Sequence, residues 1–231
     1  MRRRTEGVAV ADAVGDGRVA RAERHPADVL IRRLEPLVTE ERRARLRAVI
    51  ARRLESVAVV FDRPYDPHNG AAVLRSCEAF GVQTLHVLER KGTPFAVARS
   101  VARGAEKWVD VRRHASAGSL VAWASASATT LVAAHPEGEM DPADLARVPR
   151  LAIVVGNERD GIREELEGAC AARVRVPIRG FVESLNVSVT AAILLCAATR
   201  GRPGDLPTDV QARLYARALY LTVPHAEEIV R

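Results

Sequence analysis

Short apolar runs that alternate with helix-length segments constrain the fold of this chain more than any other feature. Between residues 57 and 200, runs such as 57–61 and 151–155 are almost continuously apolar and rich in β-branched residues. Strands of this kind are typical of sheets that are covered on both faces, and their alternation with helices favours parallel pairing. The pattern predicts the α/β class, with a mostly parallel sheet and helices on both faces.

The expected elements also divide the chain. Strands are expected at residues 57–61, 84–88, 108–111, 129–133 and 151–155, with a sixth around Val174 and Val176. Helices are expected at 28–54 (split near Pro36, with Thr39 capping the second half), 70–80, 115–125, 185–200 and about 207–221. Gly81 is expected to end the helix at 70–80. The resulting division is a mobile basic segment at 1–26, a helical extension at 27–56, a main domain at 57–203 and a C-terminal helical extension at 204–231.

Composition excludes several classes of protein. The 231 residues are 48% hydrophobic and 28% charged, as in ordinary globular chains, and only 4% aromatic, which disfavours aromatic RNA-stacking platforms. Cys77, Cys170 and Cys196 form no C-x-x-C pair, so we expect free buried thiols and no zinc site or disulfide. No apolar run reaches the roughly 20 residues of a membrane span, and no apolar segment follows the opening Met-Arg-Arg-Arg. We therefore expect a cytoplasmic protein.

Positive charge is concentrated at the N-terminus. The net charge is +6, and the first 56 residues hold 14 basic against nine acidic side chains. A basic arm that contacts a polyanion has this pattern. The alternative is an Arg- and Ala-rich composition that follows from a GC-rich genome.

Four loops are candidates for a binding site, because ligands of parallel sheets bind beyond the carboxyl ends of the strands. These loops are residues 62–69, 134–142, 156–163 and 177–184. The third carries Gly156 and Gly161 but lacks the Lys-Ser or Lys-Thr of a phosphate loop, and no G-x-G-x-x-G follows a strand. The glycines instead indicate that a ligand approaches the backbone closely. No metal-binding or hydrolase motif is present, and we expect no metal.

Several polar residues in these loops have a simple structural interpretation. Asn69 and Ser184 stand where helix N-caps are expected, and Arg75 stands where a surface arginine is ordinary. Asn186 and Ser188 are less ordinary, because they interrupt the first turns of an apolar helix and must find polar partners. Taken alone, capping explains them best.

Three segments together resemble the SpoU branch of the SPOUT RNA methyltransferases. They are Asp66-Pro67-His68-Asn69 through Arg75 to Phe80-Gly81-Val82, Val155-Gly156-Asn157-Glu158 through Gly161, and Pro177 through Leu195. Lys107-Trp108-Val109 adds to the likeness, which spans about residues 40–221. Within the branch, the motifs look most like those of enzymes that act on guanosine 18 of tRNA. Asn157 and the pair Arg159-Asp160 depart from the usual pattern.

The resemblance implies a fold, a cofactor and a set of site residues. The sheet would end in a C-terminal trefoil knot that binds S-adenosylmethionine, and the enzyme would be a homodimer with each active site near the partner subunit. The implied cofactor-binding residues are Ala134, His135, Gly156, Val176, Ile178, Leu185 and Asn186. The implied catalytic residues are Asn69, Arg75, Glu158, Ser184 and Asn186. RNA would be bound by Arg75 and by the N-terminal arginines Arg42, Arg43, Arg45 and Arg47.

The implied reaction is methyl transfer to a ribose 2′-hydroxyl, with guanosine 18 in the D-loop of tRNA as the expected target. Arginine stays protonated up to a pKa above about 12, so Arg75 is expected to bind phosphate and stabilise the developing alkoxide rather than act as a base. Asn69 would orient Arg75 or the ribose, and Glu158 would order the loops or the dimer contact. Two alternatives stay open: methylation of ribosomal RNA or of another tRNA position, and a non-catalytic RNA-binding role.

Overall fold

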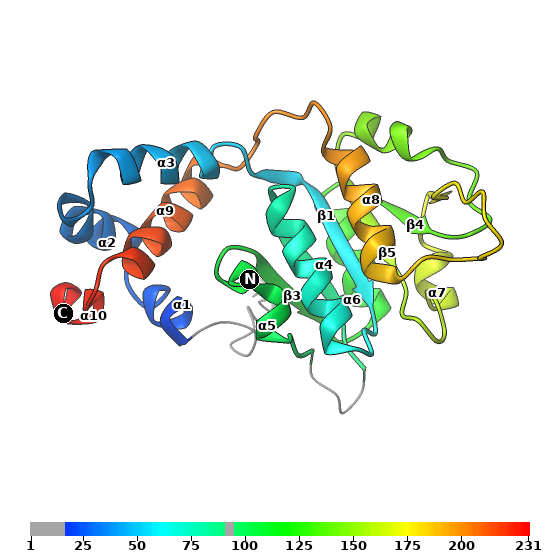
Figure 1. The fold of residues 1–231 in the computed structure, drawn as a ribbon, viewed down its shortest axis with the longest axis horizontal. Helices are drawn as coiled ribbons and strands as arrows, with labels where there is room; N and C mark the ends of the chain where they lie inside the picture. The colour runs from blue at the N-terminus through cyan, green and yellow to red at the C-terminus, as the bar shows by residue number, and fades with distance from the viewer. Residues whose placement is uncertain (1–16, 91–94) are drawn as a thin grey trace, which may run out of the picture.

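The computed structural model describes residues 17–90 and 95–231 (Figure 1). The strands are β1 Leu54–Asp62, β2 Val82–Leu88, β3 Asp110–His114, β4 Thr130–Ala134, β5 Leu151–Val155 and β6 Ala172–Val174. The α-helices are α1 Gly17–Ala22, α2 Ala27–Leu34, α3 Glu40–Ile50, α4 Pro67–Ala79, α5 Arg99–Ala102, α6 Ala117–Ala126, α7 Glu164–Glu167, α8 Val187–Thr199, α9 Thr208–Thr222 and α10 Ala226–Val230. Three 3-10 helices are η1 Glu35–Leu37, η2 Ala105–Lys107 and η3 Pro142–Arg147.

The six strands form one sheet in the order β3-β2-β1-β5-β4-β6, and every pairing is parallel. Strand β1 lies in the centre, where Val59 pairs with Leu85 of β2 and with Ile153 of β5. The prediction of a mostly parallel α/β sheet is confirmed.

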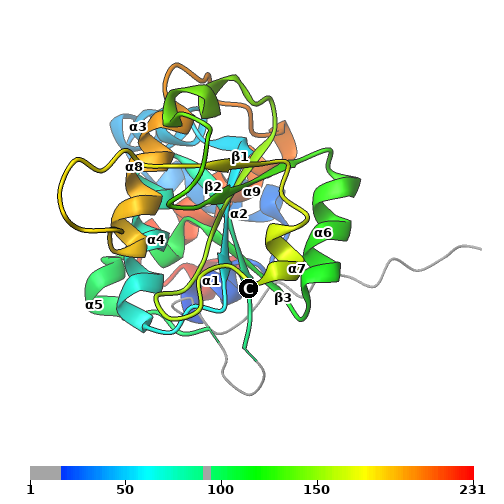
Figure 2. The same cartoon turned by 90° about the vertical axis from the view of Figure 1, so that its right-hand side faces the viewer.

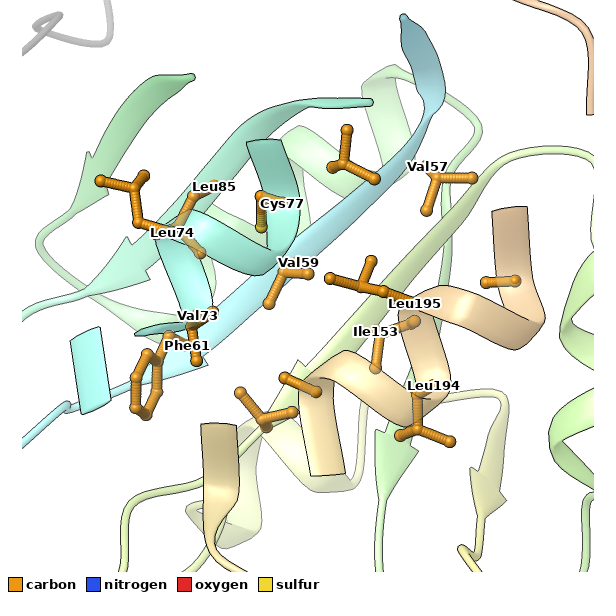
Figure 3. Packing of buried hydrophobic residues seen from close by; sticks show 14 of the residues in the cluster. Val57, Val59, Phe61, Val73, Leu74, Cys77, Leu85, Ile153, Leu194 and Leu195 are labelled. Atoms are coloured by element: carbon orange, nitrogen blue, oxygen red, sulfur yellow. The ribbon is translucent and has the colours of Figure 1, made fainter. Parts of the chain in front are cut away.

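Helices cover both faces of the sheet, as Figure 2 shows with α4, α5 and α8 on one side and α6 and α7 on the other. On the first face Val59, Phe61 and Ile153 pack against α4 and α8 (Figure 3). On the second face Val60 and Val154 pack with residues of α6 and α7. Because successive residues of a strand point to opposite faces, burial of both faces explains why β1 and β5 are continuously apolar.

A second core joins the two ends of the chain. Helices α1, α2, α3, α9 and α10 pack together beside the sheet, at the left of Figure 1. The buried Arg217 of α9 contacts Asp110 of the edge strand β3 at 2.9 Å and also pairs with Glu23. Arg213 contacts the same Asp110 at 2.8 Å. These ion pairs connect the helices to the edge of the sheet.

Two helix starts differ from the sequence prediction. Helix α4 begins at Pro67 with Asp66 as its N-cap, whose side chain accepts a hydrogen bond from the backbone of His68 at 2.8 Å. Asn69 is therefore inside the helix. Proline is well tolerated in the first turn, where its missing N–H needs no partner, so Pro67 begins the helix and does not precede it. Helix α8 is capped by Asn186 and not by Ser184.

The remaining differences lie at element ends and at the N-terminus. Leu54 begins β1 and does not end a helix, β3 begins only after η2, and Val176 lies beyond β6. The caps at Thr39 and Gly81 are confirmed, since Thr39 accepts from the backbone of Arg42 at 3.3 Å and Gly81 has φ +74°. Within the segment expected to be mobile, residues 17–22 form α1, because packing against α9 stabilises a helix too short to persist alone. Residues 1–16 lie outside the described residues.

Candidate active site

A cavity of about 630 Å³ opens at the carboxyl ends of β4, β5 and β6, where the loops after these strands meet the start of α8. Its volume falls within the range of roughly 300–1,000 Å³ that is usual for small-molecule sites. Every residue that the sequence predicted to bind a cofactor lines this cavity, namely Ala134, His135, Gly156, Val176, Ile178, Leu185 and Asn186. The side chains of Val176, Ile178 and Leu185 supply apolar surface, and Glu158, Glu167 and Thr190 add polar groups.

The loop after β5 folds back on itself at the cavity. The backbones of Asn157 and Gly161 exchange two hydrogen bonds of 3.2 and 3.1 Å, and Gly161 has φ +64°. A Cβ atom on Gly156 would lie 2.2 Å from the carbonyl carbon of Gly161, so only glycine fits there. From the sequence, the glycine is expected to allow close approach of a ligand, whereas in the structure the backbone that lies against Gly156 is that of Gly161 and Ile162 in the same loop.

The side chain of Asn157 stabilises this loop through its oxygen, while its nitrogen makes no hydrogen bond within the described residues. Its side-chain oxygen accepts hydrogen bonds from the backbones of Arg159 and Asp160, both at 2.9 Å. The side chain is 6% exposed, and its Nδ2 has no hydrogen-bond partner within the described part of the chain. Buried polar atoms are rarely left unpaired, and Asn157 lines the cavity, so this N–H₂ group is a donor available to a bound ligand.

Three polar residues from distant segments meet at the cavity. The side-chain nitrogen of Asn69 donates to Glu158 Oε1, and the side-chain nitrogen of Asn186 donates to Asn69 Oδ1 at 3.1 Å. The oxygen of Asn186 accepts from the backbone and hydroxyl of Ser188 at 2.8 and 2.6 Å. Asn69, Glu158 and Asn186 thus form one hydrogen-bond network, and Ser188 has the polar partner that its place in an apolar helix requires.

The first turn of α8 lies at the cavity, which Asn186, Val187 and Thr190 line. The helix has 13 residues, and its N-terminal amides carry partial positive charge. Such a terminus favours the carboxylate or phosphate of a ligand.

Two expected catalytic residues stand apart from this network. Ser184 lines the cavity but is exposed and makes no side-chain hydrogen bond in the described structure. Arg75 is exposed on α4 and does not line the cavity. Six residues separate it from Asn69, which is about 9 Å along the helix axis and on a different side of the helix. Within one chain, the structure does not bring Arg75 to the other site residues.

Asp62 is not among the site residues expected from the sequence, but it holds the loop after β5 in place. It ends β1, is fully buried, and accepts hydrogen bonds from the backbone of Arg163 at 2.8 Å and from its Nε at 3.0 Å. The pair ties the loop after β5 to the central strand. The sequence does contain a signal that could have identified Asp62, because it is an acidic residue at the end of an apolar run.

The predicted RNA-binding arginines on α3 fall into two pairs. Arg43 contacts Glu40 at 2.5 Å, and Arg47 pairs with Glu35 and lies over the Tyr215 ring at 4.8 Å. Arg42 and Arg45 are exposed, and their side chains have no ion pair among the described residues. Of these four arginines, Arg42 and Arg45 therefore have guanidinium groups that are free to bind an anion.

The cysteines differ in environment. Cys77 is buried, Cys170 is half-buried, and burial raises the pKa of each thiol to about 12. Cys196 is exposed on α8, which corrects the prediction that all three thiols are buried. In the described ranges no group of three or more His, Cys, Asp or Glu side chains is placed to hold a metal ion, and no helix is long and apolar enough to cross a membrane.

The parallel sheet, the folded-back glycine loop and the capped helix at one cavity agree with the class that the three sequence motifs resemble, the SPOUT RNA methyltransferases. Residues 56–196 match the model of the SpoU rRNA Methylase family. The chain therefore belongs to the SpoU family of RNA 2′-O-methyltransferases, which use S-adenosylmethionine.

Relatives with known names act on two kinds of RNA. The chain is 31% identical over 162 residues to the tRNA (guanosine(18)-2′-O)-methyltransferase of Escherichia coli (strain K12). The matched region covers 70% of each protein. It is 32% identical over 160 residues to the 23S rRNA (guanosine-2′-O-)-methyltransferase RlmB of Coxiella burnetii, which covers 68% of this chain and 63% of that protein.

Solved structures agree with this assignment. The Aquifex aeolicus TrmH/SpoU tRNA modifying enzyme superposes with a TM-score of 0.69 at 26% identity, over 80% of this chain and 98% of that one. The SpoU methyltransferase AviRb of Streptomyces viridochromogenes, solved with AdoMet, gives 0.56 at 27% identity, over 62% of this chain and 59% of that one.

The cavity fits the cofactor of the family. S-adenosylmethionine carries a flat adenine ring, a ribose and a charged amino-acid portion. The apolar residues Val176, Ile178 and Leu185 suit the adenine ring, and the amides at the start of α8 suit the carboxylate of the amino-acid portion. The unpaired Nδ2 of Asn157 offers an additional hydrogen bond.

Proposed function

We propose that this protein transfers a methyl group to the ribose 2′-hydroxyl of guanosine 18 in the D-loop of tRNA. The observation that carries the proposal is the hydrogen-bond network of Asn69, Glu158 and Asn186, which joins all three motif segments at one cavity. The named relatives support tRNA as the substrate, since the Escherichia coli and Aquifex aeolicus proteins act on tRNA.

The residues of the cavity would hold the cofactor and leave its methyl group accessible. When bound, S-adenosylmethionine supplies a methyl group on a positively charged sulfur. Ala134, His135 and Gly156 would contact it from the loops after β4 and β5, and Val176, Ile178, Leu185 and Asn186 would contact it from the segment before α8.

Arg75 would activate the RNA. A ribose hydroxyl is a poor nucleophile until its proton leaves or its oxyanion is stabilised. The protonated guanidinium of Arg75 would bind an RNA phosphate and stabilise the oxyanion, while a phosphate oxygen takes the proton. Asn69 would orient the ribose, Ser184 would contact it at the rim of the cavity, and Glu158 would hold Asn69 in place.

The place of Arg75 supports a homodimer. Because it does not line the cavity of its own chain, it would act on RNA bound at the cavity of the other subunit. A surface suited to a second copy is present on α8, where Val189 and Ile193 lie about one turn apart and are 46% and 38% exposed. Exposed apolar side chains on one helix face favour burial against a partner.

Three further features belong to the same proposal. We infer a C-terminal trefoil knot, which the meeting of loops 156–163 and 175–186 at one cavity supports. We keep the division into an N-terminal segment at 1–26, a helical extension at 27–56, a methyltransferase domain at 57–203 and a C-terminal helical extension at 204–231, with residues 17–22 of the first segment helical. We also infer a cytoplasmic location, in keeping with an RNA substrate and three free cysteines.

Two measurements test the function. Calorimetry on the purified protein should show binding of S-adenosylhomocysteine without metal. Mapping of 2′-O-methyl groups in total RNA, from cells with and without the gene, should show loss of the mark at guanosine 18 of tRNA. A mark lost from ribosomal RNA would favour the second candidate, which the Coxiella burnetii relative supports. Cofactor binding with no lost mark would favour a non-catalytic RNA-binding protein.

A further inference from the structure

Two arginines and a tyrosine form a cluster beside the active site. The guanidinium carbons of Arg90 and Arg159 lie 4.1 and 3.7 Å from the centroid of the Tyr65 ring, and Arg159 also donates to the Tyr65 hydroxyl at 2.7 Å. Neither Tyr65 nor Arg90 is among the site residues expected from the sequence, and Arg159 stands out there only as a departure from the family pattern.

The strand order brings these residues together. Tyr65 follows β1, Arg90 follows β2, and Arg159 lies in the loop after β5. Strands β2 and β5 are the two neighbours of β1 in the sheet, and parallel strands end at the same edge. Tyr65 therefore stands between the two arginines at the edge where ligands of parallel sheets bind.

The cluster lies at the rim of the cavity. Arg159 directly follows Glu158, which lines the cavity and accepts the hydrogen bond from Asn69. Tyr65 lies four residues before Asn69 in the same connection between β1 and α4. A nucleotide with its ribose at Asn69 therefore has its neighbouring backbone close to this cluster.

The two cations have aromatic contacts but no acidic partner. Neither Arg90 nor Arg159 forms an ion pair with a carboxylate among the described residues, whereas the nearby Arg63 and Arg163 both contact the buried Asp62. Tyr65 is 40% exposed and Arg159 is exposed, so the cluster is open to solvent. The two positive charges beside one ring repel each other, and an anion bound close to both guanidinium groups would offset that repulsion.

We propose that Arg90, Tyr65 and Arg159 bind the phosphate backbone of the substrate RNA next to the methylated nucleotide. Guanidinium groups bind phosphate with paired hydrogen bonds, and the Tyr65 ring fixes their position before RNA arrives. Contacts to phosphate position an RNA without reading its sequence. This inference rests on the proposed function, because it assumes that RNA enters at the cavity.

The test compares the double variant Arg90→Gln/Arg159→Gln with the control Arg147→Gln/Arg200→Gln, which changes the net charge equally. Arg147 is exposed on η3, and Arg200 follows the last residue of α8, about 20 Å along the helix from the cavity. The probe is an unmodified tRNA transcript, whose affinity is measured at several salt concentrations. Binding of S-adenosylhomocysteine and thermal midpoints are measured on the same samples.

We expect the cluster variant to bind the transcript about tenfold more weakly, with a salt slope smaller by about 1.4–1.8 for two lost phosphate contacts. Binding of S-adenosylhomocysteine should not change, and the control should retain wild-type RNA affinity. Tyr65→Ala should weaken RNA binding more than Tyr65→Phe, which keeps the ring under both guanidinium groups.

Three outcomes would overturn the inference: wild-type RNA affinity and slope in the cluster variant, an equal loss in the control, or no binding of RNA by the wild-type protein. Failure of the proposed function gives a different result. In that case the wild-type protein binds the transcript but does not methylate it, and the loss in the cluster variant still supports the cluster as an RNA-binding surface.

Discussion

The side chain of Asn186 donates a hydrogen bond of 3.1 Å to the side chain of Asn69, although 117 residues separate the two positions. Asn186 also caps α8, so one residue both begins the helix at the cavity and connects it to α4. Asn69 in turn donates a hydrogen bond to Glu158 in the loop after β5. A change at Asn186 therefore acts on helix stability and on site geometry, and the two effects can be separated.

Substitutions at Asn186 should separate capping from positioning. Asn186→Ala removes the cap and should cost about 1 kcal/mol of unfolding free energy, whereas Asn186→Ser keeps a capping oxygen and should cost about 0.5 kcal/mol or less. Both lose the bond to Asn69, so both should lower the methylation rate at least about tenfold, or ~1.4 kcal/mol in the barrier. Denaturant melts and single-turnover assays measure the two effects. Full activity of Asn186→Ser would show that the network is not needed.

Gly156→Ala should weaken cofactor binding. The added Cβ would lie 2.2 Å from the carbonyl carbon of Gly161, so the loop that forms one side of the cavity must move. Gly180→Ala is the matched control, because no atom lies within 4 Å of the Cβ it adds. Calorimetry with S-adenosylhomocysteine should show at least about a tenfold loss for the first variant. A loss of similar size in the control would contradict the explanation.

Arg75→Ala should reduce turnover far more than it reduces cofactor affinity, because the proposed role of Arg75 concerns the transition state and it does not line the cavity. Arg75→Lys should restore little, since lysine lacks the planar fork of donors. Rates under saturating cofactor and RNA provide the measurement, with Arg200→Ala as the control. We would abandon the catalytic role if Arg75→Ala stayed within about tenfold of the wild-type rate.

The arginines of α3 should not contribute equally to RNA binding. Arg42 and Arg45 have no ion pair among the described residues, whereas Arg43 and Arg47 already pair with Glu40 and Glu35. The variant Arg42→Gln/Arg45→Gln should therefore lower the salt slope of tRNA binding by about 1.4–1.8, and Arg43→Gln/Arg47→Gln should lower it less. Unchanged slopes in both would indicate that α3 is a solvated face.

Acid should destabilise the protein through His86 and His114. Burial, with the nearby His114 and Arg112, lowers the pKa of His86 well below its ordinary value, and burial with Arg112 also lowers the pKa of His114. In the unfolded chain both histidines titrate at about pH 6.5, so below that pH the unfolded state binds more protons and the stability of the fold decreases. Thermal midpoints at about pH 7.5 and about pH 5.5 measure the effect.

The variant His86→Gln/His114→Gln provides the control for the acid effect. It removes both titrating rings, which lie 2.8 Å apart at their nearest nitrogens. Its midpoint at neutral pH should be lower, because the pair is buried. The difference in midpoint between the two pH values should nevertheless shrink, and an unchanged difference would assign the acid sensitivity to other groups.

Much of the fold could be predicted from the sequence, because burial of both sheet faces leaves a continuous apolar run at each central strand. The strand at Leu151–Val155 was predicted with its exact bounds for this reason. Helix starts were less predictable, since Asp66, Asn69, Ser184 and Asn186 are all capable N-caps and local pattern does not choose among them. The choice came from packing, which places Asn69 and Asn186 where they contact each other.

The sequence by itself determined the α/β class and the order of the six strands, because these depend on periodicity and residue type, which are local properties of the chain. The residues that gather at the cavity were implied by the resemblance of three motifs to the SpoU family. Only the tertiary structure decided that Arg75 lies away from its own cavity, that Asp62 is buried against Arg163, and that Tyr65 lies against Arg90 and Arg159. These contacts depend on the strand order β2-β1-β5, and no periodicity within a segment encodes which strands become neighbours.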